Sequence, residues 1–418
     1  MVFTLFANSA FAYTVDTFFG SPLILGIEDL TVEAGGNLST DPGANSQMPS
    51  VFVDGNSTIT LNSGAVAISA QGLGIEAGAI EARGVLESLD INDGVVTSNA
   101  ASGTVKYTNL GNVDSVINVS SSGVISNITS GGIAVSKINN NNLDLTINNS
   151  GVLIAVSHAD SKVISIVDSD GGSSLALNNN GTIGASIVGT PLGKAIYLSG
   201  SGNSATIANS STGTIRGAVE INDANASITN QSSSLIYGNV SAITGDLDIT
   251  NSGTVTGNIV LGINASSSLT INGGSITGNV TLNNASQLLT FNGNLNDSLI
   301  GNVNGAGKIL VSANTVLNGN IGNSTALSQV EVAASKTLYA SDNNNSISAT
   351  NIKLNSGSGL RINAESLSGT VDGGAPNQGI VTLDVDGVKT NSATIGSSNG
   401  IEKLTITGDD YYVLTMSN

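Results

Sequence analysis

The stretch TVTGNIVLGINASSSLTINGGSITGNVTL, from Thr254 to Leu282, contains one short phrase twice. The phrase reads Val255-Thr-Gly-Asn-Ile259 at its first occurrence and Ile276-Thr-Gly-Asn-Val280 at its second, 21 residues later. Both copies begin and end with a branched apolar residue and carry Gly-Asn before the last position. The return of one pattern at this distance indicates a chain built from structural repeats.

Further copies of the phrase lie on both sides of this stretch, and a fainter one begins at Ile183. Successive copies start 21, 19, 21, 23 and 18 residues apart. In order they are Ile215-Arg-Gly-Ala-Val219, Ile236-Tyr-Gly-Asn-Val240, Val255-Thr-Gly-Asn-Ile259, Ile276-Thr-Gly-Asn-Val280, Leu299-Ile-Gly-Asn-Val303 and Leu317-Asn-Gly-Asn-Ile321.

A second phrase precedes most copies of the first and alternates apolar with polar residues. This alternation is typical of a half-buried β-strand. Small polar turns such as TNSG and NGG separate the two phrases. The copies are Leu145-Thr-Ile147, Leu175-Ala-Leu177, Ala205-Thr-Ile207, Ala226-Ser-Ile228, Leu247-Asp-Ile249, Leu269-Thr-Ile271 and Leu289-Thr-Phe291.

A period near 20 residues with two or three short strands predicts an all-β fold, a right-handed parallel β-helix (β-solenoid) with ~20-residue rungs. One rung cannot bury its own apolar face, whereas stacked rungs bury a continuous column. If residues 50–410 are mostly coiled, on the order of 18 rungs form a rod of roughly 85 Å. Leucine-rich repeats need a Leu-x-x-Leu-x-Leu signature that is absent here, and propeller blades need ~40 residues.

The regularity of the spacing divides the chain. We expect a signal-peptide remnant, an N-terminal cap, irregular β-helix rungs with enlarged turns or loops, a regular β-helix, and a C-terminal β-helix continuation in which the phrase is lost. These segments are residues 1–12, 13–50, 51–204, 205–325 and 326–418, respectively.

The phrase also predicts where its side chains lie. The branched residues at positions one and five point inward, and the Gly occupies a bend where the chain needs a positive φ or close packing. The Asn that follows the Gly stacks on its equivalents and hydrogen-bonds along the axis. These stacked residues are Asn239, Asn258, Asn279, Asn302 and Asn320.

Composition excludes several classes of protein. The chain of 418 residues is 39% hydrophobic and 10% charged, which argues against intrinsic disorder. Its net charge of −18, with only 12 dispersed Lys and Arg, argues against nucleic acid and anionic lipid as partners. It has no Cys, so it has no disulfide framework and no thiolate chemistry.

The N-terminus has features of export. An apolar run from Val2 to Ala7 leads to Ala10-Phe11-Ala12, which matches an A-x-A cleavage pattern, so the mature chain would begin at Tyr13. No other apolar run reaches the ~18 residues of a membrane helix. We therefore expect that residues 13–418 do not insert into a membrane.

These features resemble the passenger domains of bacterial autotransporters. The phrases NSGTVTGNI and LNGNIGNSTALSQVEV are similar to those of the rickettsial-type outer-membrane surface antigens, with the best likeness over residues 140–340. The resemblance implies an adhesive rod that is exported and displayed at the cell surface, anchored at the outer membrane. It also implies a C-terminal β-barrel translocator, which is absent from this chain: the sequence ends at Tyr411–Asn418, so it is either a fragment or anchored differently.

An enzyme remains an alternative because many β-helices are polysaccharide lyases or glycoside hydrolases. Such chemistry needs convergent carboxylates. The rung after Asp246 and Asp248 carries Ser268 and Thr270 at the matching positions, so that pair has no acidic partner there. We expect each candidate to lie on a solvated strand face or in a turn. The candidates are Asp168 with Asp170, Asp246 with Asp248, Asp384 with Asp386, and Asp409 with Asp410.

The single His, His158, precedes Asp160 by two residues and could form a base with an orienting carboxylate. We expect it to be a surface residue in a loop, because no nucleophile elbow and no Cys accompanies it. The sequence assigns no catalytic, cofactor-binding or metal-ligating residue. It predicts a non-enzymatic structural and adhesive protein whose partner is a receptor on a host-cell or bacterial surface. A self-associating surface-layer or filament component is a further alternative.

Overall fold

The computed structural model describes most of the chain and contains only strands as regular elements within the described residues. These residues are 23–26, 29–32, 37–40, 50–62, 67–70, 79–99, 102–108, 112–138, 142–156, 158–169, 171–185, 193–264, 266–293, 302–322, 325–341, 346–363, 366–384 and 390–408. The chain divides into two units, Met1–Asp248 and Ile249–Asn418.

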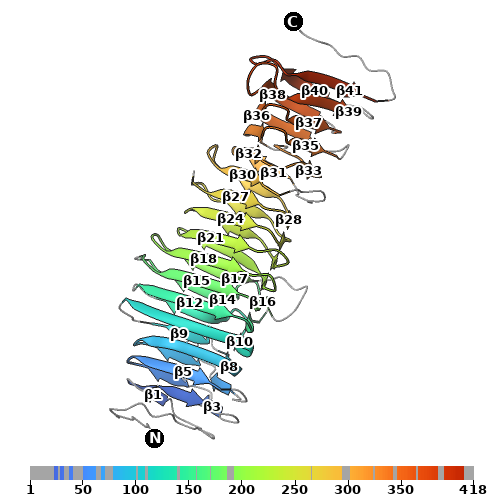
Figure 1. Ribbon diagram of the computed structural model, residues 1–418. Coiled ribbons are helices and arrows are strands. Elements are labelled where there is room, and N and C mark those ends of the chain that lie inside the picture. The colour runs from blue at the N-terminus through green and yellow to red at the C-terminus, as the bar shows by residue number, and fades with distance from the viewer. Residues whose placement is uncertain are drawn as a thin grey trace. The chain divides into compact units, whose positions relative to one another are not determined.

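In the first unit, strands from successive turns of the chain pair in parallel and form three ladders (Figure 1). Ladder 1 contains β1 (Leu23–Leu25), β4 (Val51–Val53), β7 (Ile80–Ala82), β9 (Val105–Tyr107), β11 (Ile133–Ile138), β14 (Lys162–Val167), β17 (Lys194–Ser199), β20 (Ala218–Asn222) and β23 (Val240–Ala242).

Ladders 2 and 3 are joined by two long strands that bend from one ladder into the other. Ladder 2 contains β2 (Leu30–Val32), β5 (Ser57–Leu61), the first parts of β8 (Leu86–Ser98) and β10 (Val113–Asn127), β12 (Leu143–Asn149), β15 (Ser174–Asn179), β18 (Ser204–Asn209) and β21 (Asn225–Asn230). Ladder 3 contains β3 (Asn37–Thr40), β6 (Ala67–Ala70), the ends of β8 and β10, β13 (Val152–Ala155), β16 (Thr182–Ala185), β19 (Thr214–Arg216) and β22 (Leu235–Tyr237).

The second unit repeats the same parallel arrangement, beginning within β24 (Leu247–Asn251). Ladder 1 contains β26 (Ile259–Leu261), β29 (Val280–Leu282) and β31 (Val303–Gly305), and continues through Ile321. Ladder 2 contains β27 (Ser268–Ile271), β30 (Leu288–Phe291), β32 (Lys308–Val311) and β34 (Leu327–Val332). The strands β36 (Ser346–Leu354), β38 (Ser366–Gly373) and β40 (Thr390–Ile395) follow β34. Ladder 3 contains β25 (Thr254–Val255) and β28 (Ser275–Ile276). In the later turns a separate sheet follows, which we count with ladder 3, although no pairing among the described residues joins it to β28: β33 (Thr315–Leu317), β35 (Thr337–Ala340), β37 (Gly359–Ile362), β39 (Ile380–Asp384) and β41 (Lys403–Thr407).

This architecture confirms the predicted all-β parallel β-solenoid, while its right-handed winding stays a prediction. The described part of residues 13–50, which the sequence places in a cap, adds β1, β2 and β3 to the three ladders. Residues 1–12, which carry the proposed signal remnant, lie outside the described residues.

The pairing register gives the length of each turn. In the first unit Leu145 pairs with Leu175, which is 30 residues later, as the looser spacing of residues 51–204 had indicated. Ile207 pairs with Ile228, and in the second unit Ile259 pairs with Val280; both steps are 21 residues. The 30-residue turns near the middle of the first unit have six-residue strands in ladder 1, such as Lys162–Val167, whereas β23 in a shorter turn has three residues.

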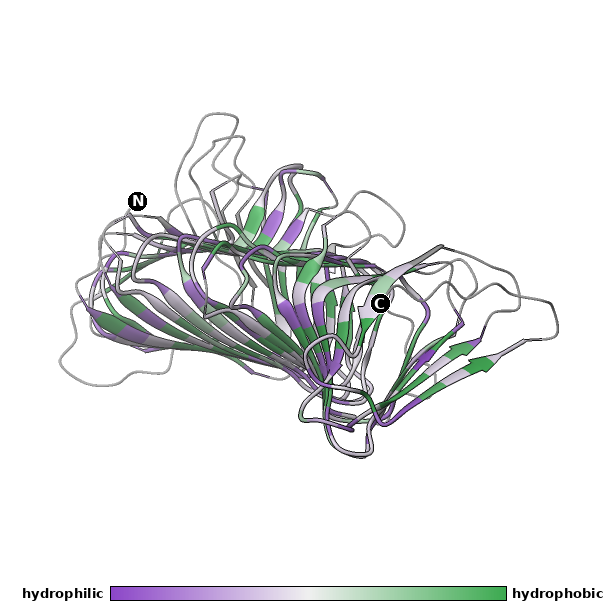
Figure 2. Cartoon of the chain, turned by 90° about the horizontal axis from the view of Figure 1, so that it is seen from above, coloured by the Kyte–Doolittle hydropathy of each residue, from purple (hydrophilic) through white to green (hydrophobic). Residues whose placement is uncertain are grey.

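The branched ends of the repeated phrase point inward, as predicted. Val255, Ile259, Ile276 and Val280 are all 0% exposed. Polar and apolar residues alternate along each strand, and the same alternation recurs in neighbouring rungs (Figure 2). The buried apolar side chains are the main favourable term in folding, with each large aliphatic side chain contributing about 1.5–3 kcal/mol on burial.

The Gly of the phrase lies at the corner between ladder 3 and ladder 1, where successive turns come very close. A Cβ on Gly278 would lie 2.4 Å from the carbonyl oxygen of Gly257 in the previous rung, so only Gly fits. Gly217 has a φ of 134°, which other residues rarely adopt.

The Asn that follows this Gly does stack, but mainly through its backbone. The N–H of Asn279 donates to Asn258 Oδ1 at 2.8 Å, and the N–H of Asn302 donates to Asn279 Oδ1 at 2.9 Å. A bond between two side-chain amides joins Asn320 Nδ2 to Asn302 Oδ1, at 2.8 Å. The predicted hydrogen bonds along the axis are therefore present. In most of them the donor is the backbone N–H and not, as predicted, the side-chain amide group.

We predict that Val280→Asp destabilises the second unit by about 3–5 kcal/mol, because it buries an unpaired charge. Val280 is 0% exposed and lies in register with Ile259 and Val303. Thr281→Asp, on the outward face of the same strand, should shift the urea midpoint by far less. Equal shifts for the two variants would show that the register is wrong.

Candidate functional site

The aspartates that sequence analysis raised as acid–base candidates have different environments. Asp248 is exposed on ladder 2, as expected, and the backbone N–H of Asp246 donates to Asn225 Oδ1 at 2.9 Å. Asp384 lies 3.4 Å from Arg361 Nη2 and has a side chain that is 19% exposed. The remaining candidates, Asp170, Asp386, Asp409 and Asp410, lie outside the described residues.

Asp168 contradicts the expectation of a solvated face or turn. Its side chain is 0% exposed and forms an ion pair with Lys137, whose side chain is 5% exposed. The hydroxyl of Ser173 donates to Asp168 Oδ2 at 2.8 Å and accepts from Lys137 Nζ at 2.8 Å. The expectation failed because Lys137 lies 31 residues before Asp168 and approaches it only through stacking of rungs.

Lys137 occupies a position that its neighbours fill with core residues. In ladder 1 it pairs with Tyr107 on one side and with Ile166 on the other, and both are at most 1% exposed. Its ammonium group therefore reaches from an apolar column to the corner between ladder 1 and ladder 2. A charge at such a position is tolerated only with a charged partner and further hydrogen bonds.

Other polar groups line the same corner in neighbouring rungs. The Tyr107 hydroxyl lies 2.9 Å from Ser115 Oγ, and burial raises the pKa of this hydroxyl, which the bond with Ser115 only partly offsets. Asn203 Oδ1 accepts from the Ser173 N–H at 3.0 Å, and its Nδ2 donates to Ser199 O at 2.8 Å. The corner is a satisfied polar network inside the fold.

A second buried network, which sequence analysis missed, lies at the corner between ladder 2 and ladder 3. It consists of asparagines on successive rungs, each of which donates from its Nδ2 to the Oδ1 of the asparagine one rung later. The three bonds, Asn149 to Asn179, Asn179 to Asn209 and Asn209 to Asn230, measure 2.7, 2.8 and 2.8 Å. All members are at most 1% exposed. This inner asparagine row consists of Asn149, Asn179, Asn209 and Asn230.

The inner asparagine row also ties ladder 2 to ladder 3. Asn149 Nδ2 lies 3.3 Å from the carbonyl oxygen of Thr182, and Asn209 Nδ2 lies 3.2 Å from that of Leu235. Asn149 Oδ1 is buried and has no hydrogen-bond partner among the described residues. Val119 occupies the matching position one rung earlier, and its side chain has no group that could donate a hydrogen bond to this oxygen.

A parallel set of amides lies on the outward face of ladder 2. Asn178 Nδ2 donates to Asn148 Oδ1 at 2.8 Å, and Asn148 Nδ2 donates to Asn118 Oδ1 at 2.8 Å. Asn118 Nδ2 in turn donates to Asp90 Oδ1 at 2.6 Å. We call Asn118, Asn148 and Asn178 the outer asparagine row.

His158 is exposed, as predicted, with a side chain that is 46% accessible to solvent. Its Nδ1 accepts from the backbone N–H of Asp160 at 3.2 Å and lies 3.7 Å from the Asp160 carboxylate, which is itself 85% exposed. The pair is a local turn at the surface, open to water on most sides.

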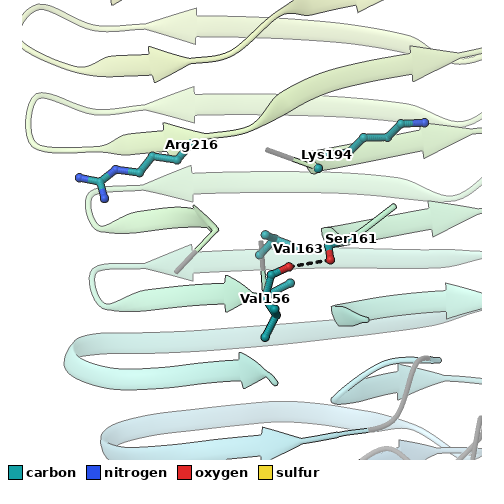
Figure 3. Close-up of a pocket in the computed structure, with 7 residues that line it drawn as sticks. Val156, Ser161, Val163, Lys194 and Arg216 are labelled. Atoms are coloured by element: carbon teal, nitrogen blue, oxygen red, sulfur yellow. Dashed lines mark hydrogen bonds between the residues drawn. The ribbon is translucent and has the colours of Figure 1, made fainter. Parts of the chain in front are cut away.

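A shallow hollow lies in the first unit between ladders 3 and 1 (Figure 3). Its volume of ≈170 Å³ includes space that is open to solvent, so it is a surface depression and not an enclosed ligand cavity. Figure 3 shows Arg216 and Lys194 extending in opposite directions, and the Ser161 hydroxyl donating to Val156 O, at 2.6 Å. Its lining residues are Ala155, Val156, Ser161, Val163, Gly193, Lys194 and Arg216.

Charged groups form surface contacts in both units. In the first unit, Lys162 and Lys194 lie 4.6 and 4.3 Å from the ring centroid of Tyr197, and Lys194 also pairs with Glu220 at 2.7 Å. In the second unit, Glu331 lies 2.9 Å from Lys353 Nζ.

The pKa of Glu331 reflects opposing effects. Burial by itself raises it, but hydrogen bonds from Asn355 and Lys353, together with the charge of Lys353, lower it below its usual value. The carboxylate is thereby kept ionised, which suits a surface ion pair between two rungs.

The described part of the chain contains no group of three or more His, Asp or Glu side chains close enough to share a metal ion. Among the described residues there is also no helical segment with the length and apolar character needed to cross a bilayer.

Comparison with protein-family models, with curated proteins and with solved structures found no significant similarity to this chain.

We predict that Asn179→Ala destabilises the first unit by about 2–4 kcal/mol, because it removes one acceptor and one donor from buried amides. The matched control is Asn178→Ala, which removes the adjacent amide from the exposed outer asparagine row and should cost at most about 0.5 kcal/mol. Urea unfolding of both variants measures the difference. Similar losses would contradict a special role for the inner row.

We also predict that Asp168→Ala costs about 3–5 kcal/mol, because it leaves the Lys137 ammonium buried without its counter-charge. Asp248→Ala, at an exposed site, should change the free energy of unfolding by no more than about 0.5 kcal/mol. If Asp168→Ala retained full stability, the ion pair would have no structural role.

Proposed function

We propose that this chain is the passenger domain of a bacterial autotransporter, exported to the outside of the outer membrane. In this proposal it is a structural and adhesive domain that binds a receptor on host or neighbouring cells without catalysing a reaction. The supporting features are the parallel β-solenoid, the absence of Cys from the sequence, and the resemblance of the repeats to surface-antigen passenger domains.

The observation that carries the proposal is the repetition of small polar side chains on the outward face of ladder 2. The outer asparagine row presents an amide on three successive rungs. In the next outward row, Thr146, Ala176, Thr206 and Ser227 lie in register. In the second unit Thr270 pairs with Thr290.

Such a face presents hydrogen-bonding side chains on most of these rungs, with successive rungs about 4.8 Å apart and alanines such as Ala176 in between. It suits a ligand that is itself repetitive, because many weak contacts then add up by avidity. The net charge of −18 disfavours non-specific attraction to acidic cell surfaces. Binding should therefore depend on a particular partner and persist in moderate salt.

We predict that beads coated with residues 13–418 attach to cultured host cells or to bacteria, and that attachment falls in steps as amides are removed. Asn148→Ala and Asn178→Ala should each weaken attachment partly, and the double variant should weaken it further. Thr382→Ala, on the outward face of ladder 3, is the matched control and should attach like the unaltered chain.

A turnover screen on acidic and neutral polysaccharides tests the catalytic alternative. Release of unsaturated or reducing sugar that is lost on mutation of an acidic pair would replace adhesion by a carbohydrate-active enzyme. Failure of the beads to attach to any cell surface would refute adhesion by this segment.

A further inference from the structure

The Lys137–Asp168–Ser173 cluster brings an amine, a carboxyl group and a hydroxyl group into mutual contact inside the first unit. The Lys137 and Asp168 side chains are 5% and 0% exposed, and Ser173 is 1% exposed. Ser173 Oγ lies 2.8 Å from Lys137 Nζ and 2.8 Å from Asp168 Oδ2. An amide-forming condensation requires the amine and the carboxyl group, and a hydroxyl group that contacts both can transfer protons between them.

We propose that Lys137 and Asp168 join through an intramolecular isopeptide bond. The bond would link the Nζ of Lys137 to the Cγ of Asp168 and form after the rungs have stacked. The inference concerns a covalent modification of the fold, and it does not depend on the adhesive function proposed above.

The first reason is that the backbone holds both groups in place. Lys137 is fixed in ladder 1 by pairing with Tyr107 and Ile166. The backbone N–H of Asp168 donates to Ser199 O at 3.0 Å and anchors the main chain at the corner, while the Ser173 hydroxyl holds the carboxyl group through its bond to Oδ2. Two reactants that are held in contact react as if their concentration were about 10⁵–10⁸ M.

The second reason is the dry surroundings. A low-dielectric interior favours the neutral pair, amine with carboxylic acid, over separated charges more than water does. The neutral amine is the nucleophile, and the protonated carboxyl group is the electrophile that can release water. Exclusion of bulk water also disfavours hydrolysis of the amide once it has formed.

The step balances without any further reactant. One proton passes from the Lys137 ammonium to Asp168 Oδ2, and the free Nζ lone pair attacks Cγ. The second proton leaves Nζ through the Ser173 hydroxyl, which contacts both atoms, and reaches the departing oxygen. The Cγ–Oδ2 bond breaks, the N–Cγ bond remains, and one water molecule leaves, so that the ion pair becomes a neutral amide. No oxidation or reduction takes place.

The bond would connect neighbouring rungs, since β11, which carries Lys137, pairs with β14, which directly precedes Asp168. It would close a loop between residues 31 positions apart in a chain that has no Cys for disulfides. Unlike a disulfide, it is not opened by reducing agents.

The test is to purify the full-length chain after it has folded, and then to denature it and measure its intact mass. We expect the mass to be lower than that of the sequence by one water molecule. Protease digestion should yield a branched peptide in which the segment with Lys137 is joined to the segment with Asp168. Dehydration elsewhere in the chain would give the same mass but linear peptides.

Variants identify the reacting groups. Lys137→Met should restore the full sequence mass, whereas Lys353→Met, at the surface pair with Glu331, should keep the one-water deficit. Ser173→Ala should slow formation of the branched peptide by about a hundredfold or more, because it removes the proton relay. A purely structural role of Ser173 would leave that rate unchanged.

The mass and the peptides of the unaltered chain test the isopeptide bond even if a variant fails to fold. A folded chain with the full sequence mass, and with Lys137 recovered in a linear peptide, would overturn the proposal. The cluster would then be an ion pair only.

Discussion

The structure depends on in-register parallel stacking, in which each residue meets its equivalent one rung later. This constraint decides what every inward position can contain. An apolar side chain finds an apolar neighbour, as Ile259 finds Val280. A buried polar side chain can find its partner in the next rung, as Asn149 does in Asn179. Removing one such side chain therefore leaves unsatisfied groups in the neighbouring rungs.

Each corner of the rung differs in how the chain turns and in which groups satisfy its hydrogen bonds. Between ladders 3 and 1 the turn is tight, and Gly278 allows the chain to touch the rung beneath it. Between ladders 2 and 3 the inner asparagine row supplies the hydrogen bonds, and in the second unit Asn251 donates to the Gly253 and Ser275 carbonyls. Between ladders 1 and 2 side chains from the strand ends fill the space, including Lys137 in the first unit and Gln287 in the second, where Gln287 Nε2 donates to Asn264 O.

The sequence predicted what depends on local periodicity and missed what depends on register between distant residues. The inward ends of the phrase at Val255 and Ile259 follow from their spacing alone. The inner asparagine row has a visible signal, since an Asn follows the alternating strand phrase by two residues at Asn149, Asn179 and Asn209, but alternation alone does not tell whether that Asn is buried. The pairing of Lys137 with Asp168 had no local signal, because it needs the 30-residue register and an inward-facing lysine to be known.

The inner asparagine row also has a direction. Asn149, Asn179 and Asn209 each donate to the asparagine of the following rung, so these amide dipoles align head to tail and polarise one another. The row therefore has an open acceptor at its N-terminal end, because Asn149 Oδ1 is buried and has no hydrogen-bond partner among the described residues. An amide at the matching position of the preceding rung, which Val119 occupies, would donate to this oxygen and lengthen the row.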